Sequence, residues 1–316
     1  MTTKNLITLG AVAVVLGGAA YFLNGGAKSS APKLNGKAVV PGLDCSAVAK
    51  IEVGAKLALA AGDKGWTVAT LSGYPADREK IVENLLKLRE LKVGQVVRGK
   101  KLEATTPVVL KDAAGKELAK VELGPKHEKW GHGRYAKFAG EAVLVSDGLD
   151  AYDGDAKQWC NTRIASIPSS DVTAVSYKRG NELVELTKGT NSTWVLKGLT
   201  DKEELDSSKT YSLDSALSYL DFNSVADPKL TEAELGFATG SVYTVTYKDG
   251  SNTVKRVATV GNKVKDGSDR YFKMDNGNWI YTISSYSAEN MMKTRKDLVK
   301  AKPEPKKDEP KKEGKK

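Results

Sequence analysis

Both histidines of the chain lie in one short segment beside a carboxylate, as His127, Glu128 and His132. Histidine and carboxylate side chains are ligands of catalytic zinc, which needs three protein ligands and an open position. The spacing differs from that of the helical His-Glu-x-x-His motif, in which both histidines share one face. Glycines flank His132, as in a hairpin loop, so the segment is either a metal site or an exposed polar loop.

A second group of oxygen ligands follows this segment. It consists of Asp147, Asp150, Asp153 and Asp155. Calcium takes six to eight oxygen ligands at close spacing, which such a group offers. The order of an EF-hand loop and its closing glutamate are missing, so a solvated turn before a helix is the alternative interpretation.

Other common catalytic signatures are missing from the sequence. It has no Gly-x-Ser-x-Gly elbow, no cysteine with a plausible histidine partner, no Walker loop, and no Gly-x-Gly-x-x-Gly after a predicted strand. The sequence therefore predicts no catalytic residues, no cofactor and no enzymatic activity.

The two cysteines, Cys45 and Cys160, form either one disulfide or two buried thiols. In an oxidising compartment an even number of cysteines favours a disulfide. Closing so long a loop would stabilise the fold by about 4–5 kcal/mol in the chain-entropy model.

The net charge of +10 resides at the chain ends. Residues 1–37 carry four lysines and no acid, and residues 300–316 carry eight lysines against four acids. The rest is close to neutral and has no charge surplus with which to follow a phosphate backbone, so we expect no nucleic-acid partner.

Residues 6–23 form an apolar run without any charge, preceded by a short tail at 1–5. As a helix this run would span about 27 Å, close to the thickness of the hydrocarbon core of a bilayer. An uncleaved transmembrane anchor is predicted, with a cleaved signal peptide as the alternative. Residues 24–38 read as a flexible linker and 299–316 as a disordered tail rich in Lys, Pro and Glu.

The body of the chain contains an internal duplication. Trp66 matches Trp194 in a hairpin, and Arg134-Tyr135 matches Arg270-Tyr271 before another strand. The offset between the copies rises steadily along the chain, as two related copies with small loop insertions require. We predict modules at 39–150 and 165–298, joined by a helical segment at 151–164.

Each predicted module has one main helix. Apolar residues recur at helical spacing in 76–91 and in 212–222, with Asp77 and Ser212 as N-caps. The expected fold class is α+β: a transmembrane helix followed by two mainly antiparallel, β-rich repeats.

Several of these features resemble the domain-of-unknown-function 4340 family. They are the N-terminal apolar run, residues 41–44, the tryptophan-closed hairpin, the helix opened by residues 74–77, Arg134-Tyr135, and Trp159 with Arg163. The resemblance implies a bacterial inner-membrane protein with its body facing the periplasm or cell exterior. It also implies an accessory role beside an envelope protein such as a subunit of an ABC-type transporter.

Two tryptophans have no match between the copies, Trp130 and Trp279, and are candidates for an interface with a partner. The sequence thus predicts a non-catalytic, extracytoplasmic interaction protein. The alternative is an envelope hydrolase or a glycan-binding module with a site between the two repeats.

Overall fold

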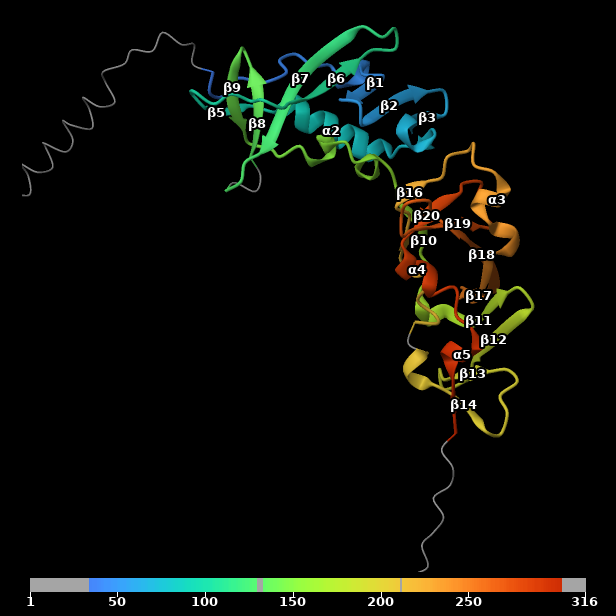
Figure 1. Cartoon of the computed structure of the whole chain (residues 1–316). Helices are drawn as coiled ribbons and strands as arrows, with labels where there is room; N and C mark the ends of the chain where they lie inside the picture. The colour runs from blue at the N-terminus through green and yellow to red at the C-terminus, as the bar shows by residue number, and fades with distance from the viewer. Residues whose placement is uncertain (1–33, 130–132, 211, 303–316) are drawn as a thin grey trace, which may run out of the picture.

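The computed structural model describes residues 34–129, 133–210 and 212–302 (Figure 1). Two large β sheets make up two lobes, a first lobe before residue 150 and a second lobe after residue 162. Every pairing between the described strands is antiparallel, as predicted, so neighbouring strands are joined mostly by short turns.

The first sheet has nine strands in the order β4-β3-β2-β1-β6-β7-β8-β9-β5. Alternate side chains of β1, Ile51 and Val53, are fully buried, as the two-residue period of a half-buried strand requires. The strands are β1 (Lys50–Val53), β2 (Leu57–Gly62), β3 (Gly65–Val68), β4 (Tyr74–Pro75), β5 (Val93–Val96), β6 (Thr106–Lys111), β7 (Glu117–Lys126), β8 (Arg134–Phe138) and β9 (Glu141–Val145).

Helix α2 (Arg78–Glu90) runs along one face of this sheet (Figure 1). The carboxylate of Asp77 accepts hydrogen bonds from the first-turn amides of Glu79 and Lys80, which have no partner within the helix. Ile81, Leu85 and Leu88 are buried in the core. The predicted helix of the first module and its N-cap are therefore confirmed, with ends shifted by one or two residues.

The second sheet has eight strands in the order β13-β12-β11-β17-β18-β19-β20-β16. If β4 is set aside, this order equals that of the first sheet, with β11 in the place of β1 and β16 in the place of β5. The strands are β11 (Val172–Arg179), β12 (Glu182–Lys188), β13 (Trp194–Leu196), β16 (Ser224–Val225), β17 (Ser241–Asp249), β18 (Asn252–Lys263), β19 (Arg270–Met274) and β20 (Tyr281–Ile283).

The prediction of a main helix at 212–222 is wrong. Its described residues form turns held by i to i+3 hydrogen bonds, such as that from Ser218 N to Ser215 O, and the chain then enters strand β15 (Leu220–Asp221). Serine side chains compete with the backbone for hydrogen bonds and so favour turns over a helix.

The strands of the second sheet also explain this difference. At the places of Val53 and Val108, which pair in the first sheet, the second sheet has the larger Tyr177 and Tyr243. The hydroxyl of Tyr243 donates to the Leu213 carbonyl over 2.9 Å, which fixes the turn conformation.

The predicted fold class therefore needs correction from α+β to a mostly antiparallel β structure with few helices. No helix among the described residues is long and apolar enough to cross a membrane, and the predicted anchor at 6–23 lies outside those residues. Beyond α2, the described α-helices are α3 (Glu232–Leu235), α4 (Ser285–Glu289) and α5 (Arg295–Leu298). Two small sheets pair β10 (Arg163–Ala165) with β15, and β14 (Glu203–Leu205) with β21 (Val299–Ala301).

Residues 150–162 join the lobes through two 3-10 helices, η3 (Asp150–Asp153) and η4 (Ala156–Trp159). The indole of Trp159 is fully buried and donates to the Ala151 carbonyl over 2.9 Å. Its own carbonyl accepts from the Asp77 amide, next to the start of α2. The joint is thereby anchored on the first lobe.

Tyr74 of the first lobe contacts the second lobe directly. Its ring lies edge-on at 5.0 Å from both Phe222 and Trp279, and Phe222 stacks on Tyr281 at 5.3 Å. These contacts make the buried residues of both lobes one continuous hydrophobic cluster.

Candidate functional site

Both sheets contain the same irregularity, a β-bulge with a glycine. The register of β7 with β8 shifts between Leu123 and Lys126, and that of β18 with β19 shifts between Val260 and Lys263. At the bulge an arginine binds the glycine carbonyl: Arg134 Nε donates to Gly124 O over 2.8 Å.

The second lobe repeats this arrangement. Arg270 Nη1 donates to Gly261 O over 3.1 Å. An added Cβ at Gly261 would lie 2.1 Å from the Leu235 carbonyl, so helix α3 and the turn after it sit directly on the bulge. Leu235, Phe237 and Tyr271 belong to a small hydrophobic cluster that covers this position.

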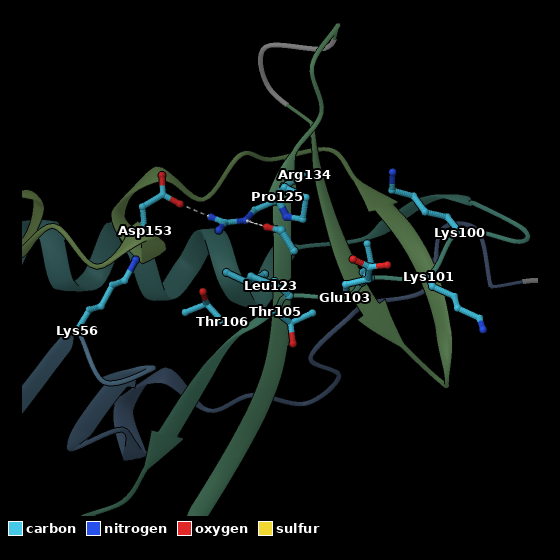
Figure 2. A pocket seen from close by; sticks show the side chains of 13 residues that line it. Lys56, Lys100, Lys101, Glu103, Thr105, Thr106, Leu123, Pro125, Arg134 and Asp153 are labelled. Carbon is cyan, nitrogen blue, oxygen red and sulfur yellow. Dashed lines mark hydrogen bonds and ion pairs between the residues drawn. The ribbon is translucent and has the colours of Figure 1, made fainter.

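The first lobe has a smaller cover, in which Leu102 lies 3.4 Å from the place of an added Cβ at Gly124. Its segment 97–105, which links β5 to β6, is shorter than the corresponding 226–240. Beside the bulge it leaves an open cavity of about 580 Å³ (Figure 2). The lining comes from the turn between β1 and β2, segment 97–105, β7, β8 and η3, and includes Lys56, Lys100, Lys101, Glu103, Arg134 and Asp153.

Arg134 is the most buried charged group of this cavity, with a side chain 6% exposed. Besides Gly124 O, its guanidinium binds the carbonyls of Gly148 and Leu149, and Nη1 lies 2.8 Å from Asp153 Oδ1. Its Nη2 has no partner among the described residues. A planar guanidinium with a donor to spare is suited to bind a carboxylate or phosphate.

The cavity carries a positive balance. Its lining has four cationic side chains and two carboxylates: Lys56, Lys100, Lys101 and Arg134 against Glu103 and Asp153. Lys126 also binds Asp153, at 2.7 Å, and Asp150, at 2.6 Å. Hydrogen bonds to Asp150 and Asp153 raise the pKa of Lys126, so this lysine stays charged.

Figure 2 shows how these side chains lie. Lys56 extends toward Asp153 at one end of the cavity, and Lys100 and Lys101 project from segment 97–105 at the other. Lys100 Nζ also lies 4.3 Å from the ring centroid of Tyr135, a cation–π contact. Tyr271, the equivalent of Tyr135 in the second lobe, is instead buried under the hydrophobic cover.

Of the candidate zinc ligands His127, Glu128 and His132, the structure describes the first two. His127 lies beside Tyr135, with ring centroids 5.5 Å apart, while His132 and the interface candidate Trp130 lie outside the described residues. Within residues 34–129, 133–210 and 212–302, no three His, Cys, Asp or Glu side chains are grouped to hold a metal ion.

Each of the four aspartates proposed for calcium contacts a backbone amide or a lysine. Asp147 accepts from the Leu149 amide at 2.7 Å, and Asp155 accepts from the Lys157 amide at 3.0 Å. Asp150 and Asp153 bind Lys126. This segment is a turn leading into the joint. Asp147 and Asp155 accept from backbone amides of the turn, and Asp150 and Asp153 form ion pairs.

The two cysteines are separate thiols rather than a disulfide. Cys45 Sγ donates to the Leu85 carbonyl and Cys160 Sγ to the Ala156 carbonyl. Burial raises the pKa of Cys160 to about 11, so this thiol is neutral at physiological pH. Trp279, the other interface candidate, contacts Tyr74 within the molecule.

Sequence reasoning missed the cavity and its lysines. Lys56, Lys100 and Lys101 lie in segments that read as ordinary polar turns. One signal was present: the linking segment is longer and more apolar in the second copy, where Leu235 and Phe237 supply the cover.

Comparison with known proteins gave one family match. No curated protein and no solved structure matched the chain. The model of a family described as Domain of unknown function (DUF4340) matches residues 66–237, from the tryptophan-closed hairpin of the first lobe to the cover of the second. The match spans more than half of the chain, which therefore belongs to the DUF4340 family.

Proposed function

We propose that this protein is a non-catalytic binding protein whose first lobe takes an anionic group, a phosphate or a carboxylate, in its open cavity. The asymmetry between the two bulges supports this most directly. Both lobes keep the glycine and the arginine, but hydrophobic side chains fill the position in the second lobe. A cavity ringed by cations remains in the first.

The carboxylates of the cavity favour binding over turnover. Hydrolysis of a glycan typically needs two carboxyl groups, one of them protonated as the acid. Of the two carboxylates in the lining, Asp153 is bound by both Arg134 and Lys126. This carboxylate is therefore already engaged by two cations of the protein itself.

The test is calorimetric titration of the full chain with pyrophosphate and with citrate, which separate phosphate from carboxylate recognition. The double variant Lys100→Ala/Lys101→Ala removes two exposed cations of the cavity and should weaken binding about ten-fold. The matched control is Lys263→Ala/Lys265→Ala, which removes two exposed lysines of the second lobe.

Binding should also weaken as salt is raised, because the lysines are exposed and screened. Equal binding by both double variants, or no heat with either anion, would overturn the proposal.

We further infer an extracytoplasmic location and an accessory role beside another envelope protein, such as a transporter subunit. The uncharged apolar run at residues 6–23 supports attachment at the inner membrane. Protease added to cells with a permeabilised outer membrane should cleave the body while a cytoplasmic marker stays intact. A body cleaved only after the inner membrane is lysed would refute this location.

A further inference from the structure

The second lobe has a cavity of its own, of about 430 Å³, at a different place in the repeat. It lies where residues 212–218 form turns, the position that helix α2 takes in the first copy. Its lining is Ser169, Lys188, Ser192, Trp194, Thr210, Asp214 and Ser215. Four of these seven residues carry a hydroxyl group, and Trp194 supplies an aromatic surface.

The charges in this cavity cancel. Lys188 Nζ lies 2.7 Å from Asp214 Oδ2, and the two side chains are 16% and 19% exposed. Lys188 also donates to the Ser169 carbonyl over 3.0 Å and lies 5.4 Å from the ring centroid of Trp194. A paired lysine of this kind gives no net attraction to an anion, unlike the lysines of the first lobe.

Several polar atoms of the cavity remain available. The hydroxyls of Ser192 and Ser215 and the second carboxylate oxygen of Asp214 have no hydrogen-bond partner among the described residues. The Tyr177 hydroxyl is buried without a partner in the same part of the structure. After burial itself, the nearby Asp214 carboxylate contributes to raising the pKa of Tyr177.

We propose that this cavity binds a neutral polyhydroxylated ligand, a single sugar ring standing alone or within a glycan. The C–H face of a sugar would lie on Trp194, and its hydroxyls would bind Asp214 and the serines, which offer both donors and acceptors. Asp214 is the one carboxylate in the lining, so the site lacks the pair that glycoside hydrolysis uses.

The first lobe differs from the second at the equivalent position. Lys188 pairs across the hairpin with Trp194, whereas Ala61 pairs with the corresponding Trp66. The partner of Trp66 thus has no ammonium group, and helix α2 stands where the turns of the second lobe open the cavity. Trp66 is accordingly a matched control for Trp194.

Saturation-transfer NMR on the full chain tests this with glucose, mannose and N-acetylglucosamine. At least one sugar should receive saturation, and Trp194→Ala should weaken its binding about ten-fold while Trp66→Ala leaves it unchanged. Because truncation of a half-buried tryptophan can unfold the lobe, Ser215→Trp provides a second variant. It blocks the cavity from an exposed position, and Ser251→Trp in the exposed turn after β17 is its control.

Two outcomes would overturn the proposal: no transfer to any of the three sugars, or equal binding by Ser215→Trp and Ser251→Trp. The outcome is independent of the anion site, because Lys100→Ala/Lys101→Ala should leave sugar binding unchanged.

Discussion

Two buried tyrosines, Tyr243 and Tyr177, face each other on neighbouring strands of the second sheet and differ in one respect. Their rings lie 5.2 Å apart, and the side chains are 0% and 3% exposed. The Tyr243 hydroxyl donates to Leu213 O, whereas the Tyr177 hydroxyl has no partner among the described residues. Replacing each by phenylalanine therefore removes the same atom from two environments.

The two substitutions should change the free energy of unfolding differently. Tyr243→Phe leaves the buried Leu213 carbonyl unpaired, which costs about 1–3 kcal/mol. Tyr177→Phe removes a hydroxyl that was buried without compensation, so the free energy of unfolding should stay unchanged or rise by about 1 kcal/mol. The turns at residues 212–218 should also become more exposed in Tyr243→Phe.

Urea denaturation followed by tryptophan fluorescence measures both variants, with the slope against denaturant compared first to exclude a change of mechanism. Hydrogen exchange of residues 213–218 gives a local readout. If Tyr177→Phe destabilised the protein as much as Tyr243→Phe, the assignment of hydrogen-bonded and unbonded hydroxyls would be refuted.

Three further outcomes follow from the fold. Gly261→Ala should destabilise the protein more than Gly124→Ala in thermal denaturation, because its Cβ would meet a carbonyl at 2.1 Å rather than a side-chain atom at 3.1 Å; equal losses would contradict the tight cover. The free energy of unfolding should fall as pH rises from 9.0 toward about 11, since the unfolded Cys160 thiol ionises first, as do buried tyrosines whose pKa values are also raised, so Cys160→Ala should reduce this slope and an unchanged slope would contradict the burial of the thiol. Tyr74→Ala should broaden the distance distribution between the lobes in X-ray scattering, and an unchanged profile would show that the joint alone holds them.

Local patterns in the sequence predicted the local structure well. The turn glycines, the tryptophan hairpin and the capped helix at Asp77 each depend on residues a few positions apart. The repeated strands were visible because the same side chains recur in the same order. The common strand order of the two sheets agrees with that pattern.

The second helix could not be predicted reliably because its fate depends on distant residues. Leu213 and Leu217 have helical spacing, but Tyr177 and Tyr243 on remote strands occupy volume and supply a competing hydrogen bond. Periodicity reports which side chains are buried and does not report what they are buried against.

The candidate sites were hidden for a related reason. Each cavity exists because a segment present in one copy is shorter or differently folded in the other. The aspartates attracted attention by their type, but their contacts are with a backbone amide of a turn and with Lys126 at the end of β7. Lys56 and Lys100 are ordinary surface residues until the fold brings them to one cavity.

The glycine bulge with its bound arginine has a consequence for sequence variation among family members. The glycine and the arginine depend on each other in both lobes, as Gly124 with Arg134 and Gly261 with Arg270. A side chain on the glycine, or loss of the guanidinium, would remove the hydrogen bond to the glycine carbonyl. These four positions should tolerate almost no exchange. The segments 97–105 and 226–240 pass over the bulge without belonging to the ladder, so they are free to lengthen, shorten and change chemistry. Diversity in what relatives recognise should therefore accumulate there, around a frame that stays constant.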